Sequence, residues 1–231
     1  MKPGQQEGIV VSEDLPRSSE GAPPVSVQVW GPGALFTRPE LKVERVSYPV
    51  ITPTAAIGVL ESIFWKPEFR FIPVAIDVLA PIKQFTQRRN ETTDIAPLRA
   101  ALAGRTVDAA EHRTQRHSVC LRDVCYRIHA HVELRAHATK PVAAYRDQFR
   151  RRVDRGQCFH QPYLGTREFS AYFGPVDEQE RISTSADLGV MLHSVHHDDA
   201  GVRFSWFDAE LRGGRMLVPP VGRGLVEPVG A

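Results

Sequence analysis

The sequence feature that most constrains the fold is a strict alternation of apolar with other residues over positions 123–134. Its apolar members are Val124, Tyr126, Ile128, Ala130, Val132 and Leu134. Between them stand Asp123, Cys125, Arg127, His129, His131 and Glu133. Successive side chains of a β-strand point to opposite faces, so this spacing predicts a half-buried strand. We therefore expect His129 and His131 on the polar face of that strand.

Weaker alternation elsewhere predicts the other strands of the same sheet. Valines at every second position predict a strand over 25–30, which Gly31-Pro32-Gly33 should end. Further strands are expected over 71–79 and over 167–173, on the two sides of the long alternating stretch.

Two stretches have helical rather than strand periodicity. Thr52 followed by Pro53 is typical of a helix start, and apolar residues recur on one helical face up to position 64. Gly58 within this helix suggests a close approach to a neighbouring element. A second helix is expected from Pro141 to about Arg155. The resulting β-α-β-β-α-β order indicates an α+β protein with a ferredoxin-like, RRM-like core.

The chain divides into three parts on this reading. Residues 1–24 contain few large apolar groups and predict a flexible N-terminal tail. Residues 25–175 would form the ferredoxin-like domain. Strands expected near 190–195, 202–207 and 215–218 predict a small antiparallel β-sheet appendage over 176–231.

Composition excludes several classes of protein. No run of 18 apolar residues occurs, so no membrane span is expected, and the first residues lack the apolar region of a secretion signal. Three cysteines without a CxxC pair argue against a disulfide scaffold and a zinc ribbon. The compact cluster His196-His197-Asp198-Asp199 is expected in a turn. We predict a cytoplasmic protein that requires no metal or other cofactor.

Basic residues are concentrated, although the net charge is only +2. The polar stretch 83–115 predicts a long exposed loop with a short helix near 96–103. The candidate phosphate-binding arginines are Arg88, Arg89 and Arg113 in this loop, and Arg150, Arg151 and Arg152 on the outer face of the second helix. Their arrangement favours an RNA-binding surface, and a solvated charged face is the alternative. The aromatic pair of a standard RNA-recognition motif is not evident.

Three residues could together cleave RNA without a metal. Cleavage requires removal of a proton from the 2′-hydroxyl, protonation of the leaving 5′-oxygen and stabilisation of charge on the phosphate. Histidine can carry out either proton transfer, arginine suits the phosphate, and a tyrosine hydroxyl can orient or exchange a proton. Arg116 and His117, with Tyr48, are the candidates. The alternatives are a packing role for Tyr48 and an ordinary surface position for His117.

Several segments resemble the Cas-five family of CRISPR-associated proteins in its type I-C form. They are Val27–Gly31, Ser47–Trp65, Arg113–Val119, Leu121–Val124 and Cys158–Phe169. The resemblance implies a member of the RAMP superfamily, with a ferredoxin-like domain and a small β appendage. It further implies an endoribonuclease that cuts CRISPR repeat RNA (pre-crRNA) at the hairpin base without metal. The products would carry a 5′-hydroxyl and a 2′,3′-cyclic phosphate. The enzyme would then remain on the 5′ handle of the crRNA beside the other subunits of the surveillance complex (Cascade).

The catalytic set implied by the resemblance is a tyrosine with an adjacent lysine-histidine pair. Tyr48 matches the tyrosine and His117 the histidine, whereas Arg116 stands at the lysine position. Arginine keeps the charge but does not give up its proton at neutral pH, so Arg116 suits electrostatic help rather than acid catalysis.

Two other functions are consistent with the same residues. The chain could be a non-catalytic structural subunit that caps the crRNA 5′ handle, or an unrelated RNA-binding module without preference for a repeat hairpin. Double-stranded DNA is a further possible ligand of a basic surface.

Overall fold

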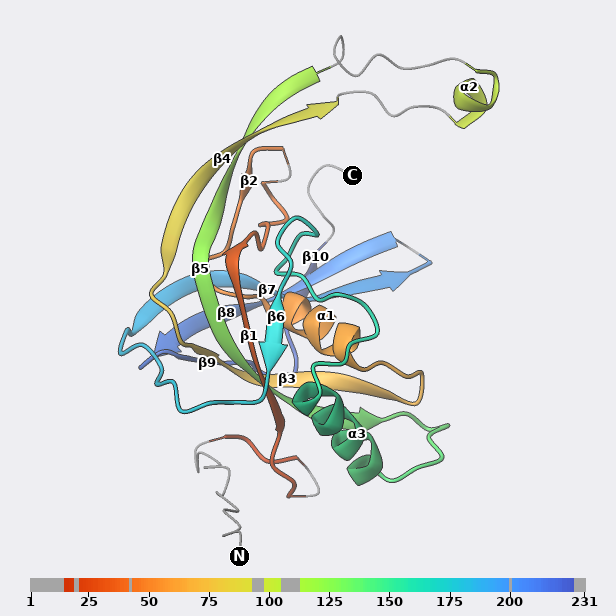
Figure 1. Cartoon of the computed structure of the whole chain (residues 1–231), viewed down its shortest axis with the longest axis vertical. Helices are drawn as coiled ribbons and strands as arrows, with labels where there is room; N and C mark the ends of the chain where they lie inside the picture. Colours follow the sequence, from red (N-terminus) through yellow and green to blue (C-terminus); the bar gives the residue numbers. More distant parts are fainter. Residues whose placement is uncertain are drawn as a thin grey trace, which may run out of the picture.

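The structure is a computed structural model, which describes residues 15–18, 21–41, 43–92, 98–104, 113–199 and 201–226. The strands are β1 (Val25–Ala34), β2 (Arg45–Val46), β3 (Phe69–Val78), β4 (Lys83–Thr92), β5 (Arg113–Leu134), β6 (Tyr172–Gly174), β7 (Ala186–Asp198), β8 (Gly201–Arg212), β9 (Arg215–Leu217) and β10 (Arg223–Val226). The helices are α1 (Pro53–Ile63), α2 (Leu98–Leu102) and α3 (Val142–Asp154). Two of the three described helices, α1 and α3, lie beside a strongly curled, largely antiparallel sheet, and the short α2 lies beyond the end of β4 and β5 (Figure 1).

β5 organises the sheet, since it pairs with four other strands. It runs antiparallel to β1, β3 and β4 and parallel to β2. The predicted alternation is confirmed on its apolar face, where Tyr126, Ile128 and Ala130 are buried. His129 lies on the other, polar face as expected, but this face does not meet solvent at that position, since the residue is only 4% exposed. Its ring contacts the buried Asp77 on the same face of the neighbouring strand β3, so this face also holds buried side chains.

Charged residues buried on this second face form one network around Asp77. The Asp77 carboxylate accepts hydrogen bonds from the Arg215 Nε at 2.6 Å and from a terminal Arg215 nitrogen at 2.9 Å, and lies 3.1 Å from His129 Nε2. Burial opposes ionisation of Asp77, but the hydrogen bonds from Arg215 and His129 hold its pKa below the usual range. The network links β3, β5 and β9 without an unpaired buried carboxylate.

The sequence predicted that Gly31-Pro32-Gly33 would end the first strand. This prediction is wrong, because β1 continues to Ala34. The two glycines instead make room for neighbours. A Cβ at Gly33 would lie 2.6 Å from the Phe169 ring, and one at Gly31 would lie 2.8 Å from a methyl carbon of Leu164. These positions therefore require glycine for close packing rather than for a turn.

The prediction of a long loop over 83–115 is also wrong at both ends, since residues 83–92 lie in β4 and residues 113–115 already belong to β5. β4 pairs with β5 residue by residue from Lys83 opposite Arg122 to Thr92 opposite Arg113. Polar side chains on both faces conceal this strand in the sequence, because neither face enters the core. α2 lies within the range predicted for a short helix, and the predicted loop residues 93–97 and 105–112 lie outside the described residues.

Both main helices are confirmed. The Thr52 hydroxyl caps α1 by accepting a hydrogen bond from the Ala55 amide at 3.2 Å. α1 buries Ala56, Val59, Leu60 and Ile63, and α3 buries Tyr145, Phe149 and Val153. Gly58 makes no close approach, since a Cβ there would meet nothing within 4 Å.

The C-terminal strands continue the same sheet. β9 pairs with both β3 and β8, and β7 and β10 flank β8. Apolar residues of β7 and β8, among them Met191 and Phe207, join the same buried cluster as those of β1. The predicted boundary at residue 176 falls inside this continuous sheet, and the division into two domains stays a prediction. His196, His197 and Asp198 lie in β7 rather than in the turn predicted for them.

The structure differs from the sequence-based expectations in the segment before β6 and in the N-terminal residues before β1. The strand expected over 167–173 is reduced to β6, with a turn-rich segment before it. Part of the predicted N-terminal tail lies against the body, because the carbonyl oxygens of Pro16 and Pro23 contact the His131 ring and the Arg146 guanidinium.

Candidate functional site

The residues predicted near position 117 lie on a two-stranded ribbon formed by β4 and β5 (Figure 1). Its register places Arg88 opposite His117 and Arg89 opposite Arg116. Directly opposite residues of an antiparallel pair share one face, whereas neighbours along a strand do not. Arg88 and His117 therefore lie on one face of the ribbon, and Arg89 and Arg116 lie on the other.

His117 is exposed, while contacts on both sides of it fix the strand that carries it. The Glu44 carboxylate accepts a hydrogen bond from the His117 amide at 2.6 Å. β2 pairs with the next two residues of β5, Ser118 and Val119. The backbone is thus held in place, and the imidazole faces solvent, where it can exchange a proton with a bound ligand.

Tyr48 follows β2 after one intervening residue, and its side chain is completely buried. Its amide donates a hydrogen bond to the Phe36 carbonyl oxygen at 2.8 Å. The Arg38 guanidinium carbon lies 4.5 Å from the centre of the Tyr48 ring. Burial raises the pKa of Tyr48 to about 12, so the phenol keeps its proton at neutral pH. This group can donate a hydrogen bond but is poorly suited to removing a proton.

On the opposite face of the ribbon, three arginines surround one carboxylate. Glu91 lies 3.2 Å from Arg45, 3.1 Å from Arg89 and 3.4 Å from Arg116. Arg89 also pairs with Glu168 at 2.8 Å. Sequence reasoning missed Arg45, Glu91 and Glu168, because three different segments contribute them. The cluster holds three positive charges against two negative ones, which suits contact with a phosphate.

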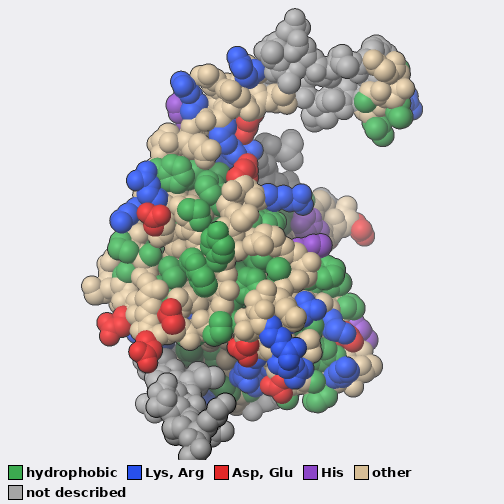
Figure 2. Space-filling view, in the orientation of Figure 1, with side chains coloured by type: hydrophobic (Ala, Val, Ile, Leu, Met, Phe, Trp, Pro, Cys, Tyr) green, Lys and Arg blue, Asp and Glu red, His purple; other side chains and the backbone are tan. Residues whose placement is uncertain are grey.

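The predicted RNA-binding arginines fall into two separate groups. Arg88 and Arg113 are exposed on the ribbon, on the face of His117. Arg150, Arg151 and Arg152 lie on α3, at the end of the molecule away from the tip of the ribbon (Figure 1). Figure 2 shows basic side chains gathered in these two places. The structure therefore does not bring the predicted arginines into one patch.

The three α3 arginines differ in their surroundings. Arg150 lies 3.6 Å from Asp147, and Arg151 donates a hydrogen bond to Gln148 at 2.9 Å, with both side chains exposed. Arg152 is half-buried, donates to the Ile63 carbonyl oxygen at 2.8 Å and lies over the Phe64 ring. Arg152 thus joins α3 to the C-terminal end of α1.

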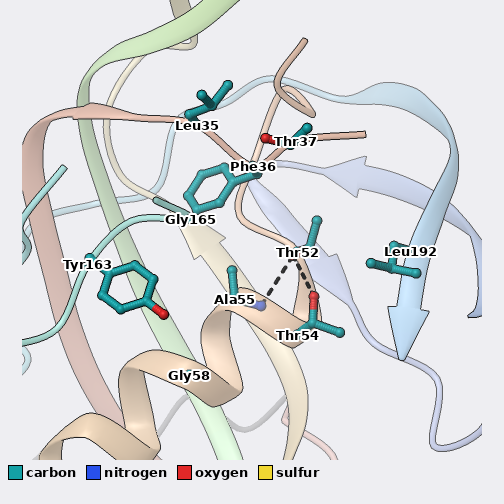
Figure 3. Close-up of a pocket in the computed structure, with 10 residues that line it drawn as sticks. All are labelled: Leu35, Phe36, Thr37, Thr52, Thr54, Ala55, Gly58, Tyr163, Gly165 and Leu192. Atoms are coloured by element: carbon teal, nitrogen blue, oxygen red, sulfur yellow. Dashed lines mark hydrogen bonds between the residues drawn. The ribbon is translucent and has the colours of Figure 1, made fainter. Parts of the chain in front are cut away.

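A hollow of about 300 Å³ lies at the N-terminal end of α1 (Figure 3). Thr52, Thr54 and Gly58 line it from the helix, and Phe36 and Tyr163 line it from neighbouring segments. The hydroxyl groups of Thr52 and Thr54 lie 3.0 Å apart. Because the Phe36 carbonyl binds the Tyr48 amide, this hollow adjoins the segment that holds Tyr48.

Within the part of the chain that the structure describes, no three His, Cys, Asp or Glu side chains are grouped so that they could hold a metal ion. Among the described helices, none combines the length and the apolar character needed to span a membrane.

Comparison with known proteins relates the whole of this architecture to one family. The family described as CRISPR-associated protein (Cas_Cas5), in its Cas5d form, matches residues 25–219. A protein of Thermus thermophilus named CRISPR pre-crRNA endoribonuclease Cas5d is 48% identical over 172 residues, covering 74% of this chain and 72% of the relative. A Mannheimia succiniciproducens protein of the same name is 38% identical over 214 residues, covering 85% of this chain and 95% of that protein.

A solved structure also resembles the fold. The crystal structure of a CRISPR-associated protein superposes with a TM-score of 0.62 at 22% sequence identity, covering 84% of this chain and 91% of the other. The family model that matches residues 25–219 and the two curated relatives point to the same group of proteins as this similar fold does. The chain belongs to the Cas5 family of CRISPR-associated proteins, in its Cas5d form.

Proposed function

We propose that this protein is a cytoplasmic, metal-independent endoribonuclease that cuts CRISPR repeat RNA (pre-crRNA) at the base of its hairpin. The curated relatives, which are 48% and 38% identical to it over the aligned residues, are named as pre-crRNA endoribonucleases. The observation that carries the proposal is the exposed His117 on a ribbon face that it shares with Arg88. A proton-transferring group and a cation thus lie side by side on a surface open to RNA.

His117 is the group that we propose for proton transfer during cleavage. The 2′-hydroxyl oxygen attacks the adjacent phosphorus, the bond to the 5′-oxygen breaks, and a 2′,3′-cyclic phosphate and a 5′-hydroxyl result. His117 either removes the proton from the 2′-hydroxyl or supplies one to the leaving oxygen. Burial raises the pKa of Tyr48 to about 12, so Tyr48 would take part in its protonated form, as a hydrogen-bond donor, once RNA binding uncovers its buried hydroxyl.

Arg116 would act through its charge. Its guanidinium is held beside Glu91 and Arg89 on the other face of the ribbon, so it can attract the RNA backbone as the backbone passes the strand. An arginine keeps this charge at every accessible pH and gives up no proton. Electrostatic stabilisation, not acid catalysis, is therefore the role that we propose for this position.

Two basic groups would hold the RNA. Arg88, Arg89 and Arg113 on the ribbon would contact phosphates near the cut, and Arg150, Arg151 and Arg152 on α3 would contact a more distant part of the RNA. After cleavage the protein would stay on the crRNA 5′ handle as a subunit of the type I-C surveillance complex (Cascade). The same surfaces would admit double-stranded DNA.

We further propose a ferredoxin-like core. Four strands lie in the order β3-β5-β1-β6, and all three pairs are antiparallel. α1 connects β1 to β3, and α3 connects β5 to β6 in chain order. With β2 and β4 treated as additions, this is the β-α-β-β-α-β order expected of such a core.

The test is to incubate the purified protein with end-labelled repeat RNA in EDTA and to map the products. We expect one cut at the hairpin base, with a cyclic phosphate on the upstream product. The control is the same RNA with a single 2′-deoxy nucleotide before the cut, which should bind equally and remain intact. Tight binding without any cut would contradict the enzyme and favour a structural subunit that caps the 5′ handle. Equal binding to random RNA would favour an unrelated RNA-binding module.

A further inference from the structure

Two large aromatic side chains lie open to solvent on the face of the sheet opposite to the core valines of β1. Trp30 of β1 and Tyr172 of β6 are direct partners in the strand register. Their ring centres are 6.2 Å apart and their planes differ by 26°. Trp30 is 39% exposed and Tyr172 is 63% exposed. Exposed paired aromatic rings of this kind are typical of binding surfaces.

Beside the rings lies a hollow of about 560 Å³, whose polar wall is built around Asp177. The Gln28 side-chain amide donates a hydrogen bond to one carboxylate oxygen of Asp177 at 2.9 Å. The Gln179 backbone amide donates to the other oxygen, also at 2.9 Å. Each oxygen keeps acceptor capacity beyond these bonds, so Asp177 is a carboxylate fixed in place and able to accept more donors.

A second carboxylate reaches the same hollow. Asp123 lines it and has a φ of 51°, the sole positive φ at a residue other than glycine in the described part of the chain. Among the residues that the structure describes, no lysine or arginine lines it. The nearby Arg127 guanidinium donates to the backbone carbonyl oxygens of Asp177 and Gln179. The hollow therefore combines negative charge with the ring of Trp30, on which Tyr172 stacks from outside the lining.

We propose that this hollow receives an arginine side chain of a partner protein. The planar guanidinium would lie on the exposed ring surface of Trp30 or Tyr172, and its N–H groups would donate to the Asp177 carboxylate. Charge complementarity selects this occupant over RNA, because phosphates would meet Asp123 and Asp177 with no lining cation. Arginine with tryptophan or tyrosine is also the pairing that dominates many protein interfaces. The site is independent of the proposed cleavage.

The test uses the full chain and a small probe, the capped tripeptide Gly-Arg-Gly, with its citrulline analogue as the matched neutral control. The signal of the Trp30 indole N–H in an NMR titration reports binding, after assignment with Trp30→Phe. We expect saturable shifts with the arginine peptide and at least about tenfold weaker binding of the citrulline peptide. Asp177→Asn and, separately, Tyr172→Ala should each weaken binding of the arginine peptide by about tenfold or more. Glu178→Gln, an equal charge change at a residue that does not line the hollow, should leave binding unchanged.

Two results would overturn the proposal. One is that the arginine and citrulline peptides shift the Trp30 signal equally, or that neither shifts it. The other is that a single-stranded RNA oligonucleotide binds at Trp30 with higher affinity than the arginine peptide, which would make the rings a platform for bases. Asp177 and Tyr172 are both exposed, so their substitution should leave the fold intact. The NMR spectra of the variants check this.

Discussion

Arg116 and His117 are neighbours in β5, yet their side chains leave opposite faces of the ribbon, where each lies across from an arginine of β4. Residues that are adjacent in the sequence therefore meet different surroundings. His117 shares its face with the exposed Arg88, and Arg116 lies in the cluster around Glu91. The two groups are thus expected to respond differently to substitution.

For Arg116, we expect charge to matter more than shape. Arg116→Gln should slow cleavage of repeat RNA by about 100-fold, because the electrostatic stabilisation that we propose for its charge is lost. Arg116→Lys restores that charge and should stay within about tenfold of the parent rate. The measurement is a single-turnover cleavage rate with saturating protein. Arg122→Gln, a change on the same face of β5, serves as the control, and an equal loss there would argue against a local role for Arg116.

Tyr48→Phe tests whether the phenol takes part in the reaction. The ring is fully buried, so the variant keeps its packing and should change the free energy of unfolding by no more than about 1 kcal/mol. Cleavage should slow by about tenfold or more, since the hydrogen-bond donor is gone. The control is Tyr145→Phe, at another buried tyrosine that lies on α3. Unchanged cleavage by Tyr48→Phe would leave Tyr48 with a packing role alone.

Substitution of two neighbouring arginines of α3 should affect two different properties: Arg152 the stability of the fold, and Arg151 the binding of RNA. Arg152→Ala loses the hydrogen bond to Ile63 and the contact with Phe64, and should lower the free energy of unfolding by about 1–3 kcal/mol in urea titrations. Arg151→Ala should change it by less than about 0.5 kcal/mol. If Arg151 contacts a phosphate, the same variant reduces the slope of log affinity against log salt by about 0.7. An unchanged slope would remove Arg151 from the RNA-binding surface.

The buried Asp77 network makes stability depend on pH. The pKa values of Asp77 and His129 are both lowered in the folded state, the first through hydrogen bonds that outweigh burial and the second through burial. The folded protein therefore binds fewer protons than the unfolded chain, and stability rises with pH. It should fall below about pH 6.5 through His129, and further below about pH 4 through Asp77.

Urea titrations across that pH range check the dependence, with His129→Gln as the variant that should flatten its upper part. Asp77→Asn should cost about 3–5 kcal/mol at neutral pH, because the buried guanidinium of Arg215 would lose the charge of the Asp77 carboxylate. A free energy of unfolding that is constant from neutral pH to about pH 4 would contradict this sign.

The parts of the fold that the sequence predicted are those in which one face of an element packs on the core. β5 shows alternation because Tyr126, Ile128 and Ala130 are buried, and α1 begins where Thr52 caps it. β4 was missed for the opposite reason: hydrogen bonds to β5 define it, and apart from Phe85 its side chains are polar on both faces. Burial of His129 depends on Asp77, which comes from another strand and carries no local signal.

The candidate site divides in the same way. Arg116 and His117 could be chosen from residue types and from the resemblance, but their separation onto two faces required the strand that the sequence concealed. Glu91 and Glu168, which hold the arginine cluster, are ordinary acidic residues until the fold brings them together. The Trp30–Tyr172 pair joins β1 to a strand of only three residues, too short for periodicity to reveal.

The most direct test of RNA cleavage by this chain is His117→Ala, with cutting and binding measured in parallel in EDTA. Cutting is followed with intact repeat RNA, and affinity with the repeat that carries the 2′-deoxy nucleotide. We expect the cleavage rate to fall by at least about 100-fold and the affinity to stay within about twofold, because the exposed imidazole transfers protons and its loss leaves the strand backbone in place. Cutting at the parent rate, or loss of cutting together with loss of binding, would contradict a catalytic role for His117.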